Sequence, residues 1–232
     1  CVVSPQADEA MGVIEARARQ LGAPLLAAGQ HWHVTEERGR LIYQDETGLR
    51  DLPLPNLPGR HQIENAGAAI AALRHLGLGD AALEAAVTRA EWPARMQRLR
   101  KGPLVDAAPR AELWLDGGHN PAAGQALAHH LGTLPKRPTH LVCGMMNTKD
   151  VTGYMAPLAT HAASLIAVSI PGEPNTLPAE DTAAAATAVG MSASRAETAL
   201  EAVRAIATAD PEARILICGS LYLAGSLLRE NG

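Results

Sequence analysis

From about residue 110 onward, short apolar runs alternate with alanine-rich segments of helical length, and this alternation is the strongest constraint on the fold. Strands that alternate with helices pair in parallel, and the helices then cover both faces of the sheet. The sequence therefore predicts an α/β fold with a Rossmann-like, doubly wound, mostly parallel sheet. The expected strands are 112–116, 139–144, 164–170 and 214–219, and the expected helices are near 121–133, 178–189 and 196–209, with a last one after Ser220.

The first part of the chain has a different pattern, and a domain boundary is expected near residues 93–96, after the helix-breaking Trp92-Pro93 pair. Two antiparallel turn signals, ERG and DETG, predict short strands within 31–52. The other expected elements are a strand at the start of the chain, a helix from Ser4-Pro5 to Gly22, and helices over 62–76 and 80–90.

Composition excludes several classes of protein. Hydrophobic residues make up 47% of the 232 residues, which is enough for a sizeable core, and no apolar run approaches the roughly 20 residues that span a bilayer. A net charge of −4 and an aromatic content of 3% disfavour nucleic-acid binding. The chain contains no P-loop, no GxGxxG and no GxSxG motif.

The ends and cysteines suggest where the protein works. Cys143 and Cys218 lie in apolar runs and are expected to be small core residues in a reducing compartment. The first residues resemble no signal peptide, so a cytoplasmic location is expected, and the missing initiator Met suggests a fragment. His31 and His33 are a candidate metal pair on one strand face, but no third ligand lies nearby, and surface histidines are the commoner case.

The segment LWLDGGHNP, residues 113–121, carries the sharpest local signal. Asp116 follows a buried strand, two glycines allow a tight turn, and Asn120-Pro121 begins a helix. Ligands of open α/β sheets bind at the carboxyl ends of strands, where Asp116, His119 and Asn120 are expected to converge. The structural alternative is that Asp116 only fills a turn and Asn120 only caps the helix.

Two further segments carry candidate nucleotide contacts. EWPARMQ, residues 91–97, places Arg95 just after the break at Pro93, where a guanidinium could reach phosphate oxygens; Arg98 follows. GRHQIENAG places Asn65 near the start of an otherwise apolar helix. The alternatives are ordinary surface ion pairing for the arginines and helix solvation for Asn65.

Six segments occur in the order seen in one enzyme family, and together they cover essentially the whole chain. They are PLPNLPGRHQIENAGAAIAAL, EWPARMQRL, ELWLDGGHNPAAG, VCGMMNTKD, PGEPNTLPAE and CGSLYLAGSLL. In these segments the chain resembles the C-terminal half of folylpolyglutamate synthase/dihydrofolate synthase, of the Mur ligase superfamily. The resemblance implies that residues 1–93 are the C-terminal part of an ATP-binding central domain and 94–232 the glutamate ligase domain.

The resemblance also implies roles for the site residues. Asn65 is similar to an asparagine that contacts adenine, and Asp116 to an aspartate that holds the nucleotide ribose. Arg95 matches the arginine of a PGR motif that contacts ATP, although Ala94 stands where the family has Gly. His119, the implied catalytic residue, and Ser220 are similar to residues associated with the incoming glutamate.

The implied activity is an ATP-dependent ligase that adds L-glutamate to folate, or to dihydropteroate, through an acyl phosphate. Its cofactors would be ATP and Mg²⁺, with the metal ligands outside this sequence, and the fragment alone is expected to be an inactive monomer without nucleic-acid or membrane partners. Two alternatives stay open: a Mur-type ligase that adds amino acids to cell-wall precursors, and a non-catalytic nucleotide-binding module.

Overall fold

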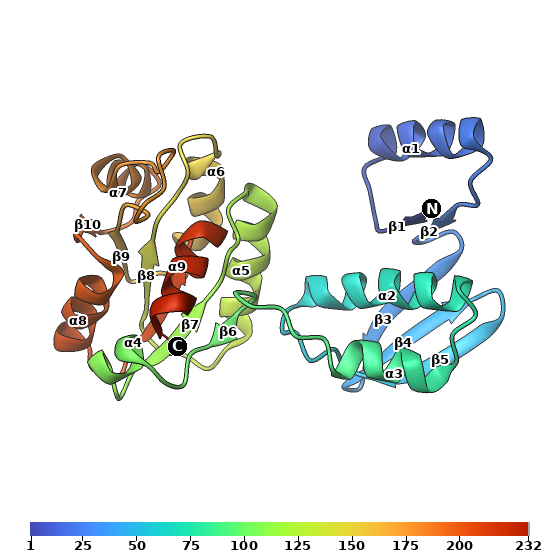
Figure 1. The fold of residues 1–232 in the computed structure, drawn as a ribbon, viewed down its shortest axis with the longest axis horizontal. Helices are drawn as coiled ribbons and strands as arrows, with labels where there is room; N and C mark the ends of the chain where they lie inside the picture. Colours follow the sequence, from blue (N-terminus) through green and yellow to red (C-terminus); the bar gives the residue numbers. More distant parts are fainter. Residues whose placement is uncertain (232) are drawn as a thin grey trace. The chain divides into compact units, whose positions relative to one another are not determined.

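The computed structural model describes residues 1–231 and divides the chain into two compact units, Cys1–Trp92 and a second that begins at Pro93 (Figure 1). Each unit has its own strands, helices and core. Among residues 1–231, no helix combines the length and the apolar character that a membrane crossing requires.

The first unit joins a small βαβ motif to an antiparallel sheet covered by helices. β1 and β2 pair in parallel, and β3, β4 and β5 form a three-stranded antiparallel sheet whose turns fall at the two predicted turn signals. The elements are β1 (Val2–Val3), α1 (Asp8–Leu21), β2 (Leu26–Ala27), β3 (Trp32–Glu37), β4 (Arg40–Asp45), β5 (Gly48–Pro53), α2 (Arg60–His75) and α3 (Asp80–Thr88).

Two local predictions in this unit are wrong. α1 begins at Asp8 rather than at Ser4-Pro5, because the backbone stays extended through Ala7 (ψ 148°). The first turn then carries Asp8 and Glu9, which stabilise a helix N-terminus electrostatically. His31 lies in the turn before β3 and accepts a hydrogen bond from the Ala27 N–H, so it does not share a strand with His33.

The core of the first unit forms where α2 packs on the antiparallel sheet. Trp32 of β3 and Tyr43 of β4 are fully buried and stack with ring centroids 6.2 Å apart. Gly67 permits the close approach of α2, because a Cβ there would lie 2.6 Å from the Trp32 ring and from the Val34 side chain. The predicted apolar face of this helix, including Ile63 and Ile70, is buried as expected.

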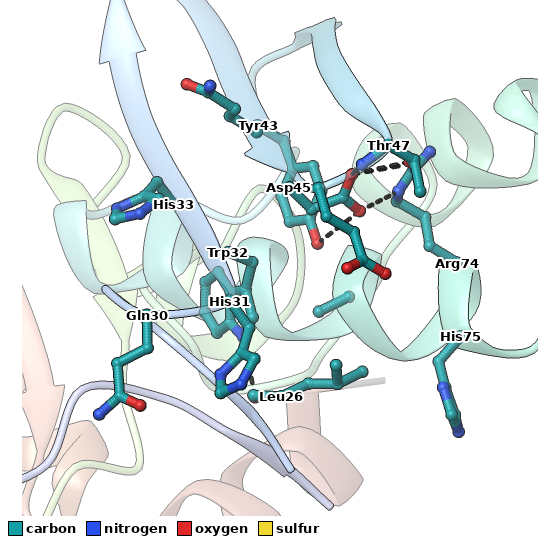
Figure 2. A pocket seen from close by; sticks show the side chains of 13 residues that line it. Leu26, Gln30, His31, Trp32, His33, Tyr43, Asp45, Thr47, Arg74 and His75 are labelled. Atoms are coloured by element: carbon teal, nitrogen blue, oxygen red, sulfur yellow. Dashed lines mark hydrogen bonds and ion pairs between the residues drawn. The ribbon is translucent and has the colours of Figure 1, made fainter. Parts of the chain in front are cut away.

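An ion pair fastens the C-terminal turn of α2 to the end of β4. The Arg74 guanidinium donates to both Asp45 carboxylate oxygens, at 2.6 and 3.1 Å, and also to the Thr47 hydroxyl. Each charged side chain is only 13% exposed. Figure 2 shows the pair at the wall of a cavity of about 440 Å³, with Tyr43 alongside.

Burial raises the pKa of Asp45, but the hydrogen bonds from Arg74 and Thr47, with the positive charge of Arg74, outweigh it and hold the pKa below the usual value. Burial, reinforced by the neighbouring Asp45 carboxylate, raises the pKa of Tyr43 to about 12. Tyr43 therefore stays protonated across the physiological pH range. Of Tyr43 and Asp45, only Asp45 changes its protonation state in acid.

The second unit is the predicted doubly wound α/β domain. Its sheet has the order β10-β9-β8-β11-β7-β6, parallel except for the edge strand β6. The elements are β6 (Gln97–Arg98), α4 (Pro103–Ala107), β7 (Glu112–Leu115), α5 (Pro121–Thr133), β8 (Thr139–Cys143), α6 (Val151–Met155), η1 (Ala156–Leu158), β9 (Ser164–Ala167), α7 (Ala179–Ala188), β10 (Ala193–Arg195), α8 (Ala199–Ala209), β11 (Arg214–Cys218) and α9 (Leu221–Asn231).

Helices cover both faces of this sheet (Figure 1). One apolar core lies under α4, α8 and α9, and a second lies under α5, α6 and α7. The central strand β11 is buried along its whole length, in keeping with the apolar run at residues 215–218, and the buried Arg214 at its start is paired with Glu112. The short edge strand β10 was not predicted, because its sequence Ala-Ser-Arg carries no strand signal and is mostly exposed.

Gly124 sets the contact between α5 and α6. A Cβ at this position would lie 2.2 Å from the Tyr154 carbonyl oxygen and 3.1 Å from Pro157 Cγ. Backbone cannot move aside as a flexible side chain can, so the close approach of α5 requires glycine.

Asp45→Asn should make the first unit less stable at neutral pH by about 1–3 kcal/mol, because it removes the charge partner of a largely buried Arg74. A carboxylate with a lowered folded-state pKa stabilises the fold above its unfolded pKa of about 4 and loses that effect as the pH falls. The penalty should therefore shrink below about pH 4 in urea unfolding at several pH values. An equal penalty at pH 7 and in acid would contradict the assignment.

Gly124→Ala should destabilise the second unit by about 1–3 kcal/mol, because the added methyl group forces α5 and α6 apart. Gly225→Ala is the matched control, since its Cβ would have ordinary contacts inside α9 and alanine favours helix. Thermal unfolding of both variants measures the difference. Equal melting temperatures for the two would show that the α5–α6 contact tolerates a side chain.

Candidate functional site

The sequence-predicted residues of the second unit gather at the carboxyl edge of its parallel sheet. Asp116 follows β7, and Ser220 follows β11, which lies next to β7. The Asp116 N–H donates to the Ile217 carbonyl at 2.9 Å, so the two strand ends are in register. This edge is where open α/β sheets bind ligands.

The Asp116 carboxylate is buried, with 5% of the residue exposed, and it joins two loops. Its Oδ2 accepts a hydrogen bond from the Met96 N–H at 2.8 Å, and its Oδ1 accepts one from the Gly118 N–H at 2.7 Å. Both are charge-assisted bonds to backbone, a strong class of hydrogen bond. Asp116 therefore fixes the segment before β6 against the segment after β7.

Arg95 lies between two residues with unusual backbone conformations. Ala94 has φ +56° and Met96 has φ +42°, in the left-handed region that non-glycine side chains avoid at a cost of about 1–2 kcal/mol each. Gly117 N–H donates to the Ala94 carbonyl at 2.9 Å, and Arg95 Nη1 also reaches that oxygen at 3.2 Å. A left-handed φ favours glycine, which is the residue that the PGR motif of the resemblance has at the position of Ala94.

His119 is held in one tautomer. Its Nδ1 lies 2.9 Å from the Gly117 carbonyl oxygen, which can only accept, so Nδ1 carries the proton and Nε2 of the neutral ring is left with a lone pair. The ring is partly exposed. Asn120 caps α5 by accepting from the Ala123 N–H at 2.9 Å, with Pro121 in the first turn. The helix cap that the structural alternative predicted for Asn120 is therefore confirmed.

Ser220 is buried and has a capping role, because its Oγ accepts from the Tyr222 N–H at 3.0 Å at the start of α9. The preceding Gly219 has φ +103°. A Cβ on Gly219 would lie 2.7 Å from the Gly144 carbonyl oxygen and 2.8 Å from Cys143 Sγ, so only glycine brings the chain into this turn.

Beneath these loops, Cys143 and Cys218 are paired across β8 and β11. Both are buried free thiols, as the sequence predicted. A hydrogen bond with Cys218 and burial raise the pKa of Cys143, and burial raises the pKa of the neighbouring Tyr154 phenol. Cys143 and Tyr154 therefore stay protonated, and all three side chains pack as core residues.

The remaining predicted residues have different surroundings. Asn65 belongs to the first unit, where it is exposed in the second turn of α2 and donates to Gln62 Oε1 at 3.0 Å. Arg98 pairs with Glu112 at 3.4 Å and lies over the Trp114 ring, so it is a structural residue. Asp150, the last residue of the segment VCGMMNTKD, caps α6 by accepting a hydrogen bond from the Gly153 N–H at 2.9 Å.

Glu112 gathers three arginines at the opposite, amino end of β7. Burial raises the pKa of Glu112, but the charges of Arg137 and Arg98 and a hydrogen bond from Arg214 outweigh it and lower the pKa. This cluster stabilises the amino edge of the sheet and is separate from the candidate site.

Gln97 is a site residue that the sequence did not reveal. Its Oε1 accepts a hydrogen bond from the Ala94 N–H at 2.9 Å, which closes the loop around Arg95. The sequence carries no signal for this role, because a glutamine beside an arginine is an ordinary pair of residues. The hydrogen bond between Gln97 and the Ala94 amide is seen only in the structure.

Comparison with known families gives a match over just over half of the chain. The sequence profile described as "Mur ligase, glutamate ligase domain" matches residues 94–221. The matched region contains the Arg95 loop, Asp116, His119 and Ser220.

Curated relatives are folate enzymes. The folylpolyglutamate synthase of Lacticaseibacillus casei is 25% identical over 94% of this chain and 51% of that protein. A probable bifunctional folylpolyglutamate synthase/dihydropteroate synthase of Haloferax volcanii is 28% identical over 82% of this chain and 22% of its own length. The chain thus spans about half the length, or less, of these relatives.

Solved structures agree on the fold. The Mycobacterium tuberculosis folylpolyglutamate synthase complexed with ADP superposes with a TM-score of 0.84 at 27% identity, over 99% of this chain and 54% of that one. E. coli FolC, in complex with DHPP and ADP, gives a TM-score of 0.78 at 26% identity, over 94% of this chain and 50% of that one. The chain therefore belongs to the Mur ligase family, and residues 94–221 are its glutamate ligase domain.

Proposed function

We propose that this chain is part of an ATP-dependent ligase that adds L-glutamate to folate or dihydropteroate. The observation that carries the proposal is the Asp116 carboxylate, which joins the Arg95 loop to the loop of His119 at the carboxyl edge of a glutamate ligase domain. The relatives support the folate branch of the family over a cell-wall ligase, because those matched are folylpolyglutamate and dihydrofolate synthases.

The proposed reaction has two steps. A carboxylate oxygen of the pterin substrate attacks the γ-phosphorus of ATP, which releases ADP and forms an acyl phosphate. The amino nitrogen of glutamate then attacks the acyl carbon, inorganic phosphate leaves, and the nitrogen loses a proton. Negative charge grows on the phosphoryl group in the first step and on the carbonyl oxygen in the second.

The residues of the second unit divide the work of binding. The Arg95 guanidinium would stabilise phosphate charge, and Asp116 would accept hydrogen bonds from ribose hydroxyls, because each oxygen of a carboxylate can accept more than one hydrogen bond. The adenine contact of Asn65, which belongs to the first unit, is proposed from the family resemblance alone.

His119 would serve the second step. With Nδ1–H fixed on the Gly117 carbonyl, the Nε2 lone pair can take a proton from the glutamate ammonium group and leave a nucleophilic amine. Ser220 is proposed to contact glutamate from the start of α9, in addition to its capping role.

Mg²⁺ would shield the phosphate charge in the complete enzyme, but residues 1–231 contain no group of three metal-ligating side chains that could hold it. No step is therefore assigned to a metal bound by this chain. We also propose a cytoplasmic location, supported by the two buried free thiols, which a reducing compartment would preserve.

Asp116→Ala should lower the affinity for ADP at least tenfold, because it removes ribose acceptors and releases the Arg95 loop; a loss of about 2–4 kcal/mol is the scale for two charge-assisted bonds. Isothermal titration of the chain with ADP measures the change. Asp181→Ala, at an exposed position in α7, is the matched control and should bind as the wild type does. Unaltered ADP affinity in a folded Asp116→Ala protein would contradict the nucleotide assignment.

His119→Ala should impair the use of glutamate, with a kcat at least a hundredfold lower at neutral pH, and leave the Michaelis constant for ATP within about twofold. The assay is glutamate-dependent ADP release by an enzyme completed with the N-terminal half that its relatives have. His129→Ala, on the exposed face of α5, should behave as the wild type does. A normal glutamate-dependent rate without His119 would show that the ring is structural.

A further inference from the structure

The loop around Arg95 combines unusual strain with dense backbone hydrogen bonding. Residues 1–231 contain three non-glycine residues with positive φ, and two of them, Ala94 and Met96, flank Arg95. Both are almost completely buried, at 2% and 3% exposure. Strained conformations of this kind persist where the surroundings determine them and often occur at functional sites.

Each strained residue has its amide held by a side chain. The Ala94 N–H donates to Gln97 Oε1 at 2.9 Å, and the Met96 N–H donates to Asp116 Oδ2 at 2.8 Å. Without these acceptors, two buried N–H groups would lose their partners, and the loop would be free to relax toward ordinary φ values.

Gln97 is well placed for this because its own backbone is fixed. It pairs with Leu115 at the start of the β6–β7 ladder, so its side chain can extend back three residues from a rigid position. A shorter side chain at 97 could not reach the Ala94 amide. Asp116 is equally fixed, at the end of β7.

We propose that Gln97 is a positioning residue: its bond to the Ala94 amide keeps the loop in the left-handed conformation that presents Arg95 to the nucleotide. This inference rests on the proposed function for its ligand, but the loop geometry that it invokes lies wholly within the second unit. Glycine adopts positive φ without strain, so the requirement for Gln97 exists because residue 94 is alanine.

The test uses the 232-residue chain, labelled with ¹⁵N, and four variants: Gln97→Ala, Gln97→Glu, Ala94→Gly and the double variant Gln97→Ala/Ala94→Gly. Hydrogen exchange at the Ala94 and Met96 amides reports loop order directly. ADP titration, followed by chemical shifts up to millimolar concentrations, reports the effect on binding. Gln125→Ala, exposed on α5, is the matched control.

Gln97→Ala should speed exchange at the Ala94 amide about tenfold, whereas Gln97→Glu, which keeps the acceptor oxygen, should preserve protection. ADP affinity should fall about 3- to 10-fold in Gln97→Ala, the factor expected for one neutral hydrogen bond, and return to within twofold of wild type in the double variant. Ala94→Gly alone should bind ADP within twofold of wild type.

Three results would overturn the inference: unchanged exchange at Ala94 in Gln97→Ala, a double variant that binds ADP as poorly as Gln97→Ala, or an ADP affinity of Gln97→Ala equal to that of the wild type. The third result, equal ADP affinity in Gln97→Ala and the wild type, would leave the proposed function intact. A wild-type chain that shows no ADP-dependent shifts at the Arg95 loop would instead contradict the nucleotide site of the proposed function, and this inference with it.

Discussion

The hydrogen bonds of the Asp116 carboxylate hold the candidate site together. One oxygen binds the Met96 amide and the other binds the Gly118 amide, so a single buried side chain connects the segment before β6 with the segment after β7. The Arg95 loop and the His119 loop depend on this connection for their relative placement. A carboxylate suits the task because its charge strengthens both bonds and its two oxygens can serve two loops at once.

The parallel sheet explains why these loops meet. β7 and β11 are neighbours, and both end at the same edge, so the turns that follow them lie side by side. Glycines then allow contacts that side chains would prevent: a Cβ on Gly117 would lie 2.2 Å from Leu221 Cδ2, and a Cβ on Gly219 would lie 2.7 Å from the Gly144 carbonyl oxygen. The same two loops thus combine close packing with the candidate site residues Asp116, His119 and Ser220. The apolar strands supply the rigidity that a positioned site requires.

The sequence predicted the architecture of the second unit because its signals are local. A buried parallel strand is mainly an apolar run, as at residues 215–218 of β11, and the Asp-Gly-Gly-His-Asn-Pro segment contains a strand end, a turn and a helix cap in succession. It did not predict the partner of Asp116, because a backbone amide leaves no trace in the sequence. The role of Gln97 and the pairing of Arg98 with Glu112 were also unpredicted, since both depend on the antiparallel β6–β7 contact. The short strand β10 and the true start of α1 lacked the local signals that the other elements had.

We propose that Asp116 and Arg95 together form the nucleotide-binding face of the glutamate ligase domain. A crystal structure of the chain with ADP is the most direct test. We expect the ribose hydroxyls within about 3 Å of the Asp116 carboxylate and the phosphates facing the Arg95 guanidinium, with the Ala94–Gln97 loop unchanged. ADP bound elsewhere on the domain, or a ribose that makes no contact with Asp116, would contradict it.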